Sequence, residues 1–151
     1  MRPIELIRVS LVRDADSPTD ERTAISRPAD MLGWLAEIRT RDREQFCCLH
    51  LDARNNVNAL EIVSTGSLNA SLAPPREVMK VAIWNNAASI ILAHNHPSDY
   101  PTPSREDIEL TRRMVNVGEI IGTEVLDHII VGPERFLSMK EANLLCHTTG
   151  G

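Results

Sequence analysis

Two histidines and a carboxylate near the middle of the chain have the residue types and the spacing of a metal site. His94 and His96 are separated by one residue, and Asp107 follows a proline-containing loop. Imidazole nitrogens and carboxylate oxygens are ligands of zinc, and catalytic zinc takes three protein ligands and keeps the fourth position for water. The pattern therefore predicts one Zn²⁺ per chain, bound by His94, His96 and Asp107.

The flanking segments predict how these side chains are positioned. Residues 88–93 form an apolar run that is typical of a buried strand, on which side chains two apart share a face. His94 and His96 can therefore point the same way. Pro97 has no N–H for a strand ladder, so the strand should end there. Ser104 suits the N-cap of a helix over 104–117, which places Asp107 in its first turn.

The same residue types also occur in a helix cap and in other classes of metal site. Ser104 and Asp107 resemble a capping box, which alone would account for both. A non-haem iron oxygenase uses the same ligand types and stays open on ligands alone. A zinc nucleobase deaminase would need H-x-E and P-C-x-x-C, which the sequence lacks. A two-metal nuclease needs further carboxylates, and Asp99, Glu106 and Glu109 are expected on the loop and helix surface. The joint pattern favours the zinc site.

Composition bounds the class of protein. The chain has 151 residues, 42% of them apolar and 25% charged, which fits one globular domain. No apolar run approaches the roughly 20 residues of a membrane span, and the N-terminus lacks a signal-peptide core. We therefore expect a cytoplasmic protein. Its three cysteines form no C-x-x-C pair and are expected to be reduced.

Charge gives no reason to expect general nucleic-acid binding. The formal net charge is −5, and a negative protein repels phosphate. Arg39, Arg41 and Arg43 form a local basic cluster, but Asp42 and Glu44 interleave with them. We interpret this cluster as a solvated rim.

The hydrophobic pattern predicts an α/β domain with a mixed sheet flanked by helices. Helices are expected over Ala29–Ile38, 75–85 and 104–117, the last ending at Gly118, with a final helix from about Lys140. Strands are expected over 3–12, 44–52, 57–63, 88–94, 123–131 and 135–138, with a polar loop over 14–26.

The motif resembles that of a known superfamily. His94, His96, Ser104 and Asp107 match H-x-H-x7-S-x-x-D, the JAMM signature of the JAB/MPN metalloproteases. Residues 74–78, 86–88, 94–98, 103–111 and 126–132 are similar to the RadC-like branch of that superfamily. The resemblance implies a single JAB/MPN domain, a cytidine-deaminase-like fold, over 28–145. Residues 1–27 would then be an N-terminal strand and loop, and 146–151 a flexible tail.

Two differences from the RadC-like pattern are visible. Asp99 stands where the family usually has glycine after His-Pro-Ser, and we expect this to affect substrate fit rather than metal binding. RadC-like proteins also carry a helix-hairpin-helix segment before this domain. The 27 residues that precede the match here are too few for that segment.

The chemistry also needs a base and an oxyanion donor. Glu44 lies at the start of a predicted strand, 50 residues before His94, as the JAMM glutamate does in the superfamily. Glu77, in the first turn of a helix, is the alternative base, although the helix dipole alone would favour an acid there. The resemblance assigns the oxyanion donor to Ser104.

Other candidate residues receive structural interpretations. His50 lies inside a predicted strand and is expected to be a hydrogen-bonded core histidine. Asp127 and His128 should face opposite sides of a strand, so only one can approach the site, in a supporting role rather than as a ligand. Cys47 and Cys48 are expected in the core. His147, Cys146 and the final Gly150-Gly151 belong to the predicted tail.

Three functional hypotheses follow. The first is a zinc metallopeptidase or isopeptidase, in which metal-activated water attacks an amide carbonyl of a peptide or isopeptide-linked protein. The second is a DNA-repair or DNA-processing accessory protein, which the acidic charge and the short N-terminus count against. The third is a metal-stabilised interaction module without turnover. The ligands together with a base favour the first.

Overall fold

A computed structural model describes residues 24–65 and 75–145. The expected strand over 3–12, most of the loop over 14–26, and Cys146, His147 and Gly150-Gly151 lie outside the described residues. The elements are a 3-10 helix, η1 (Pro28–Met31), the helices α1 (Ala36–Arg39), α2 (Pro75–Trp84) and α3 (Arg105–Ile121), and the strands β1 (Gln45–Leu51), β2 (Val57–Thr65), β3 (Ser89–Asn95), β4 (Glu124–Val131) and β5 (Phe136–Ser138).

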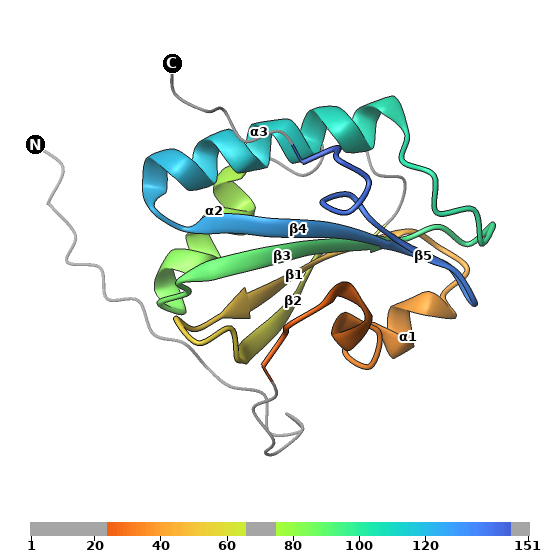
Figure 1. The fold of residues 1–151 in the computed structure, drawn as a ribbon, viewed down its shortest axis with the longest axis horizontal. Helices are drawn as coiled ribbons and strands as arrows, with labels where there is room; N and C mark the ends of the chain where they lie inside the picture. The colour runs from red at the N-terminus through yellow and green to blue at the C-terminus, as the bar shows by residue number, and fades with distance from the viewer. Residues whose placement is uncertain (1–23, 66–74, 146–151) are drawn as a thin grey trace, which may run out of the picture.

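The five strands form one mixed sheet in the order β2-β1-β3-β4-β5. β1 pairs antiparallel with both β2 and β3, whereas β3 and β4 run parallel. Parallel neighbours need a crossover connection, and α3 supplies it. Figure 1 shows α2 and α3 on one side of the sheet and α1 on the other. The predicted α/β class with a mixed sheet is confirmed.

Two apolar layers hold the helices to the sheet. On the α2 and α3 side, Phe46, Leu92 and Met114 belong to one buried cluster, and on the α1 side Leu49, Ile91 and Ile129 belong to another. Every residue of β3 is buried. Alternation along β3 places His94 on the α3 side, like Leu92, and turns Asn95 to the α1 side.

The expected helix over Ala29–Ile38 is wrong in one respect, because it is not continuous. A turn over 32–35 separates η1 from α1. Gly33 lies inside this turn, and glycine is the weakest helix former after proline. Two kinds of backbone hydrogen bond occur there. Leu35 N donates to Met31 O, four residues earlier, and Ala36 N donates to Gly33 O, three residues earlier. Met31, Leu35 and Ile38 are still all buried.

The predicted end of α3 at Gly118 is also wrong. The helix continues to Ile121 and ends at Gly122, whose left-handed backbone (φ 85°) closes it. Gly118 has a packing role instead, since a Cβ there would lie 2.5 Å from the carbonyl oxygen of Thr123. Glycine thus lets α3 approach the start of β4.

The expected final helix from about Lys140 is replaced by a turn over residues 139–143. Asn143 has a left-handed backbone (φ 57°), and the amide of Leu144 donates to the carbonyl of Met139. This is the bonding that ends a helix, so it closes the segment after a single turn. Among the described residues no helix has both the length and the apolar character needed to cross a bilayer.

Candidate metal centre

His94, His96 and Asp107 meet at the junction of β3 and α3. His94 lies near the end of β3, His96 follows it, and Asp107 is in the first turn of α3. The two Nε2 atoms are 2.9 Å apart, and the Asp107 carboxylate approaches them at 3.2 Å (Oδ1 to His94) and 3.5 Å (Oδ2 to His96). The structure therefore brings together all three predicted ligands as a possible metal site.

These separations fit a small tetrahedral ion. Ligand atoms that lie about 2.0–2.1 Å from such an ion are ~3.3 Å from one another. The two Nε2 atoms are 2.9 Å apart, and the nearest Asp107 oxygen is 3.2 Å from His94 (Oδ1) and 3.5 Å from His96 (Oδ2), so each closest pair is near that value. Imidazole nitrogens and one carboxylate are also a donor set that zinc accepts. The residues present therefore fit the ion that the sequence motif predicts.

A chain of buried hydrogen bonds fixes the tautomer of His94. The hydroxyl of Thr111 donates to the carbonyl of Asp107 (2.6 Å), so it can only accept from His128 Nδ1 (2.6 Å). His128 Nε2 then has no proton and accepts from His94 Nδ1 (2.7 Å). Burial lowers the pKa of His128 well below its usual range, which keeps it neutral. The lone pair of His94 Nε2 is left facing the centre.

His96 is oriented in the same sense by the backbone. Its Nδ1 lies 2.7 Å from the carbonyl oxygen of Tyr100, which can only accept, so Nδ1 carries the proton. Both Nε2 lone pairs therefore converge, and a cation or a proton must lie between them. A hydrogen bond with Asp107 raises the pKa of His96, against the effect of burial, so the proton is the ligand that replaces a metal ion.

Asp107 serves the helix and the site together. Its Oδ2 accepts from the amide of Ser104 (2.7 Å), and its own amide donates to Ser104 Oγ (3.1 Å). The capping box that the sequence allowed is therefore present. Burial would raise the pKa of Asp107, but hydrogen bonds from His94 and His96 outweigh it and hold this pKa far below its usual range. The carboxylate is ionised, as a ligand must be.

The comparison with known proteins agrees with this geometry. The family described as "RadC-like JAB domain" matches residues 25–144, which is most of the chain. The chain belongs to the RadC-like JAB domain family. Similar relatives, each named a UPF0758 protein, come from Moorella thermoacetica, with 56% identity over 84% of this chain and 56% of the relative, and from Desulforamulus reducens, with 48% identity over 95% and 66%. The chain thus spans between about half and two thirds of these relatives.

The JAB domain places its two candidate bases differently. Glu44 directly precedes β1, two residues before Phe46, which pairs with His94 on β3. Its charge is among the causes that raise the pKa of His96. Glu77 is on α2, where Lys80 Nζ lies 2.8 Å away and lowers the pKa of the carboxyl. The geometry favours Glu44, and its role as a base stays a prediction.

Sequence reasoning placed two other histidines correctly. His50 is fully buried, with Glu61 3.3 Å from Nε2 and Asn85 3.1 Å from Nδ1, so the predicted core role is confirmed. Asp127 and His128 do face opposite sides of β4, and only His128 approaches the site. Asp127 accepts from Ser138 Oγ on the α1 side and supports the turn after β5.

Cys47 and Cys48 are buried free thiols, and burial raises the pKa of Cys47 to about 12.

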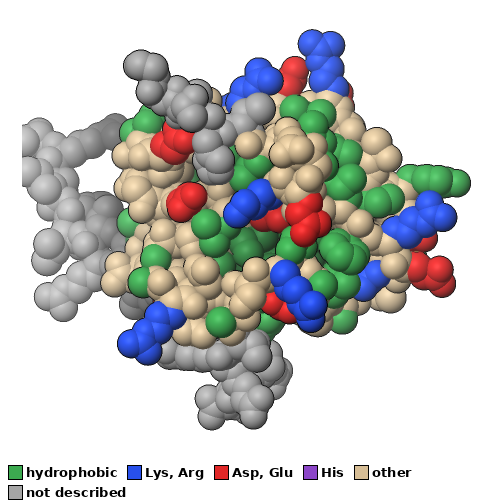
Figure 2. Space-filling model, in the orientation of Figure 1, with side chains coloured by type: hydrophobic (Ala, Val, Ile, Leu, Met, Phe, Trp, Pro, Cys, Tyr) green, Lys and Arg blue, Asp and Glu red, His purple; other side chains and the backbone are tan. Residues whose placement is uncertain are grey.

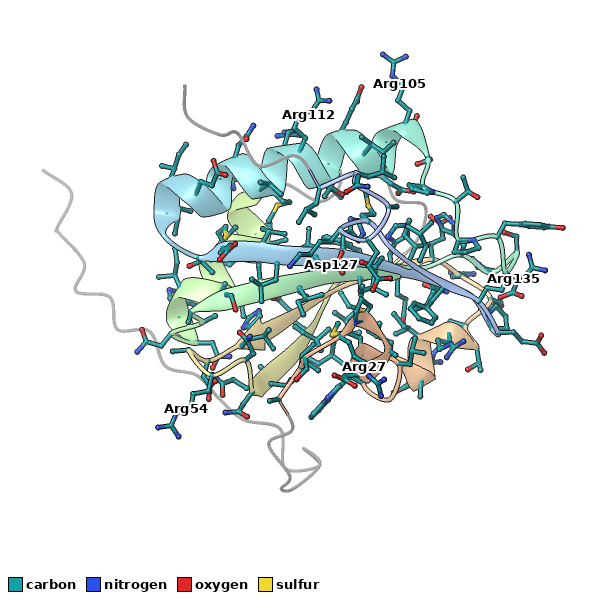
Figure 3. The ribbon with its side chains drawn as sticks, in the orientation of Figure 1. Arg27, Arg54, Arg105, Arg112, Asp127 and Arg135 are labelled. Carbon is teal, nitrogen blue, oxygen red and sulfur yellow. The ribbon has the colours of Figure 1, made fainter. Side chains whose placement is uncertain are left out.

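A cavity on the α1 side of the JAB domain is separate from this centre. Its volume is about 560 Å³, and Figure 2 shows a hollow near the middle of the face in view. Ile91 and Ile129 line it together with Asp127, which Figure 3 labels on β4, while Arg27 and Lys140 also border it. None of the three candidate ligands lines this cavity. The sheet therefore separates the two features.

Asp99 lies in the loop after His96 and connects that loop to the β4–β5 turn. Its backbone is left-handed (φ 64°), a conformation that aspartate tolerates better than most residues. Its Oδ1 accepts from the amides of Glu134 (2.9 Å) and Arg135 (3.0 Å) in the turn between β4 and β5. A Cβ on Gly132 would collide with that oxygen at 2.3 Å. The loop that carries His96 is thereby fixed to the β4–β5 turn, where Figure 3 labels Arg135.

Proposed function

We propose that this JAB domain is a zinc-dependent hydrolase of the metallopeptidase or isopeptidase type, and that its substrate is a peptide or an isopeptide-linked protein. The observation that carries the proposal is the convergence of the Nε2 atoms of His94 and His96 and the Asp107 carboxylate on one point. Zinc bound there would supply a nucleophilic water near neutral pH and polarise the amide carbonyl.

The remaining steps belong to the residues around the ligands. Glu44, whose charge acts on His96, would accept the proton of the attacking water and pass it to the leaving amine. Ser104 Oγ already accepts the amide proton of Asp107, so its own hydroxyl proton stays available. Through it, the Ser104 hydroxyl would donate a hydrogen bond to the developing oxyanion.

The exposure of the site sets the direction from which a substrate arrives. The side chains of His94 and Asp107 are 1% and 3% exposed, whereas that of His96 is 14% exposed. Ser104 is exposed and Glu44 is partly exposed. We expect the amide bond to approach from the side of His96, between Glu44 and Ser104. This access supports turnover over a purely structural metal.

The experiment compares Glu44→Gln with the matched control Glu77→Gln. The zinc-loaded protein is incubated with fluorogenic peptide amides and with lysine isopeptides, and release of the amine is measured. Glu44→Gln should keep its zinc and lose about two to four orders of magnitude in kcat. Glu77→Gln should be close to neutral. No cleavage by the zinc-loaded wild type would contradict the proposal, and an inactive Glu77→Gln beside an active Glu44→Gln would exchange the two roles.

A further inference from the structure

Asn95, between the two histidines of the motif, points away from them and is fully buried. Its side-chain oxygen accepts from the backbone amide of Gln45 at 2.6 Å. Its side-chain nitrogen donates to the carbonyl of Arg43 at 2.9 Å, with a longer contact of 3.4 Å to the carbonyl of Arg41. One buried amide therefore binds the backbone on both sides of Glu44.

This contact begins where the strand ladder ends. The pairing of β1 with β3 runs from Leu51–Ser89 to Phe46–His94 and does not extend further. Past that point the backbone amide of His96 bonds to Val131 on β4 instead, at 2.8 Å. On the β3 side, the side chain of Asn95 thus takes the place of a backbone partner for Arg43 and Gln45. On its other side Gln45 still pairs with Thr65 of β2, so Asn95 is what ties this segment to β3, the strand that leads to His96.

We propose that Asn95 is a positioning residue that holds Glu44 at the metal centre by clamping the backbone of Arg43 and Gln45. The inference rests on the proposed function in so far as Glu44 is the base. The clamp itself is a property of the backbone and can be measured without a substrate.

The first measurement is residue-resolved amide hydrogen exchange in Asn95→Ala. Gln45 N–H should exchange about tenfold faster or more, because it loses the buried hydrogen bond that protects it. The amides of Cys47 and Leu49, in the β1 ladder, should keep their rates. The matched control is Ser89→Ala, which removes a buried hydroxyl without a hydrogen-bond partner among the described residues from the same strand and face.

An unchanged rate at Gln45, or an equal acceleration at Gln45, Cys47 and Leu49, would overturn the proposal. In the second case Asn95 would contribute only to global stability. Asn95→Ser gives the same test if the alanine variant does not fold, since a serine side chain is too short to reach both Arg43 and Gln45.

The second measurement links the clamp to the site through a double-mutant cycle in zinc affinity. A carboxylate near the ion attracts it, so Glu44→Gln should weaken zinc binding by roughly three- to tenfold in the native background. In the Asn95→Ala background the same change should alter the affinity less than about twofold. An equal effect in both backgrounds, including none in either, would overturn the proposal. A wild type that binds no zinc would refute the proposed function instead, and the exchange measurement would still decide the role of Asn95.

Discussion

His94 Nδ1 lies 2.7 Å from Nε2 of His128, a histidine that reaches the site from the neighbouring parallel strand. Because His128 is neutral and accepts at Nε2, His94 must carry its proton on Nδ1. In the neutral imidazole, the nitrogen that faces Asp107 then holds the lone pair that a metal ligand needs. A residue that does not touch the predicted ion thus decides whether His94 can bind it.

The first prediction concerns Thr111, the start of this hydrogen-bond chain. Thr111→Val keeps the shape of the side chain but removes the hydroxyl that accepts from His128. His128 then loses the partner that fixes its tautomer, and zinc affinity should fall by roughly ten- to a hundredfold. Thr123→Val, a buried threonine outside the chain of bonds, is the matched control. Competition with a chromophoric chelator measures both, and equal affinities would show that the chain has no effect on the metal.

The second prediction concerns the pH dependence of the zinc-free protein. A hydrogen bond with Asp107 raises the pKa of His96 above its ordinary value, in spite of burial. The stability gained from protonated His96 is therefore complete below about pH 6.5, the usual histidine pKa, and is lost as the pH rises through the raised folded-state value.

Denaturant titrations in the presence of a chelator should show this decline above about pH 6.5 in the wild type. His96→Gln should lack that part of the decline. If the stability of the wild type instead rises above that pH, in parallel with the stability of His96→Gln, the prediction is wrong.

The third prediction tests the contact between α3 and β4, which sets the position of His128. Gly118→Ala should destabilise the fold by about 1–3 kcal/mol, because the Cβ would overlap the Thr123 carbonyl oxygen and press on Val125. This loss would occur although alanine is the better helix former by about 1 kcal/mol. Gly33→Ala, with nothing within 4 Å of its Cβ, should be neutral or slightly stabilising. If both variants unfold at the wild-type midpoint, the close contact carries no energy.

Local patterns predicted most of the fold. The five described strands and the helices α2 and α3 begin within one or two residues of the expected positions, because apolar periodicity, prolines and Ser104 act locally. The errors occur where tertiary contacts decide. A glycine at position 118 is typical of a helix end, but the helix ends at Gly122. The packing of Gly118 against Thr123 explains why a glycine stands there.

The candidate ligands were predictable because a strand end and a helix start fix their spacing. For His128, the sequence indicated only that either it or Asp127 could approach the metal site. The sequence analysis assigned no role at the site to Thr111 or Asn95. Asn95 stands inside the H-x-H motif itself, so its position was a usable signal. Its partners Arg43 and Gln45 lie about 50 residues away, and the pairing of β1 with β3 that brings them together is not encoded in any local pattern.

The central claim is that His94, His96 and Asp107 bind one zinc ion, and metal analysis of the purified protein after desalting tests it most directly. The wild type should retain one zinc per chain, and His94→Ala, His96→Ala and Asp107→Ala should each lose most of it. Glu106→Ala, an exposed acid in the same helical turn, should keep it. A wild type without zinc, or an Asp107→Ala variant with an undiminished zinc content, would contradict the account.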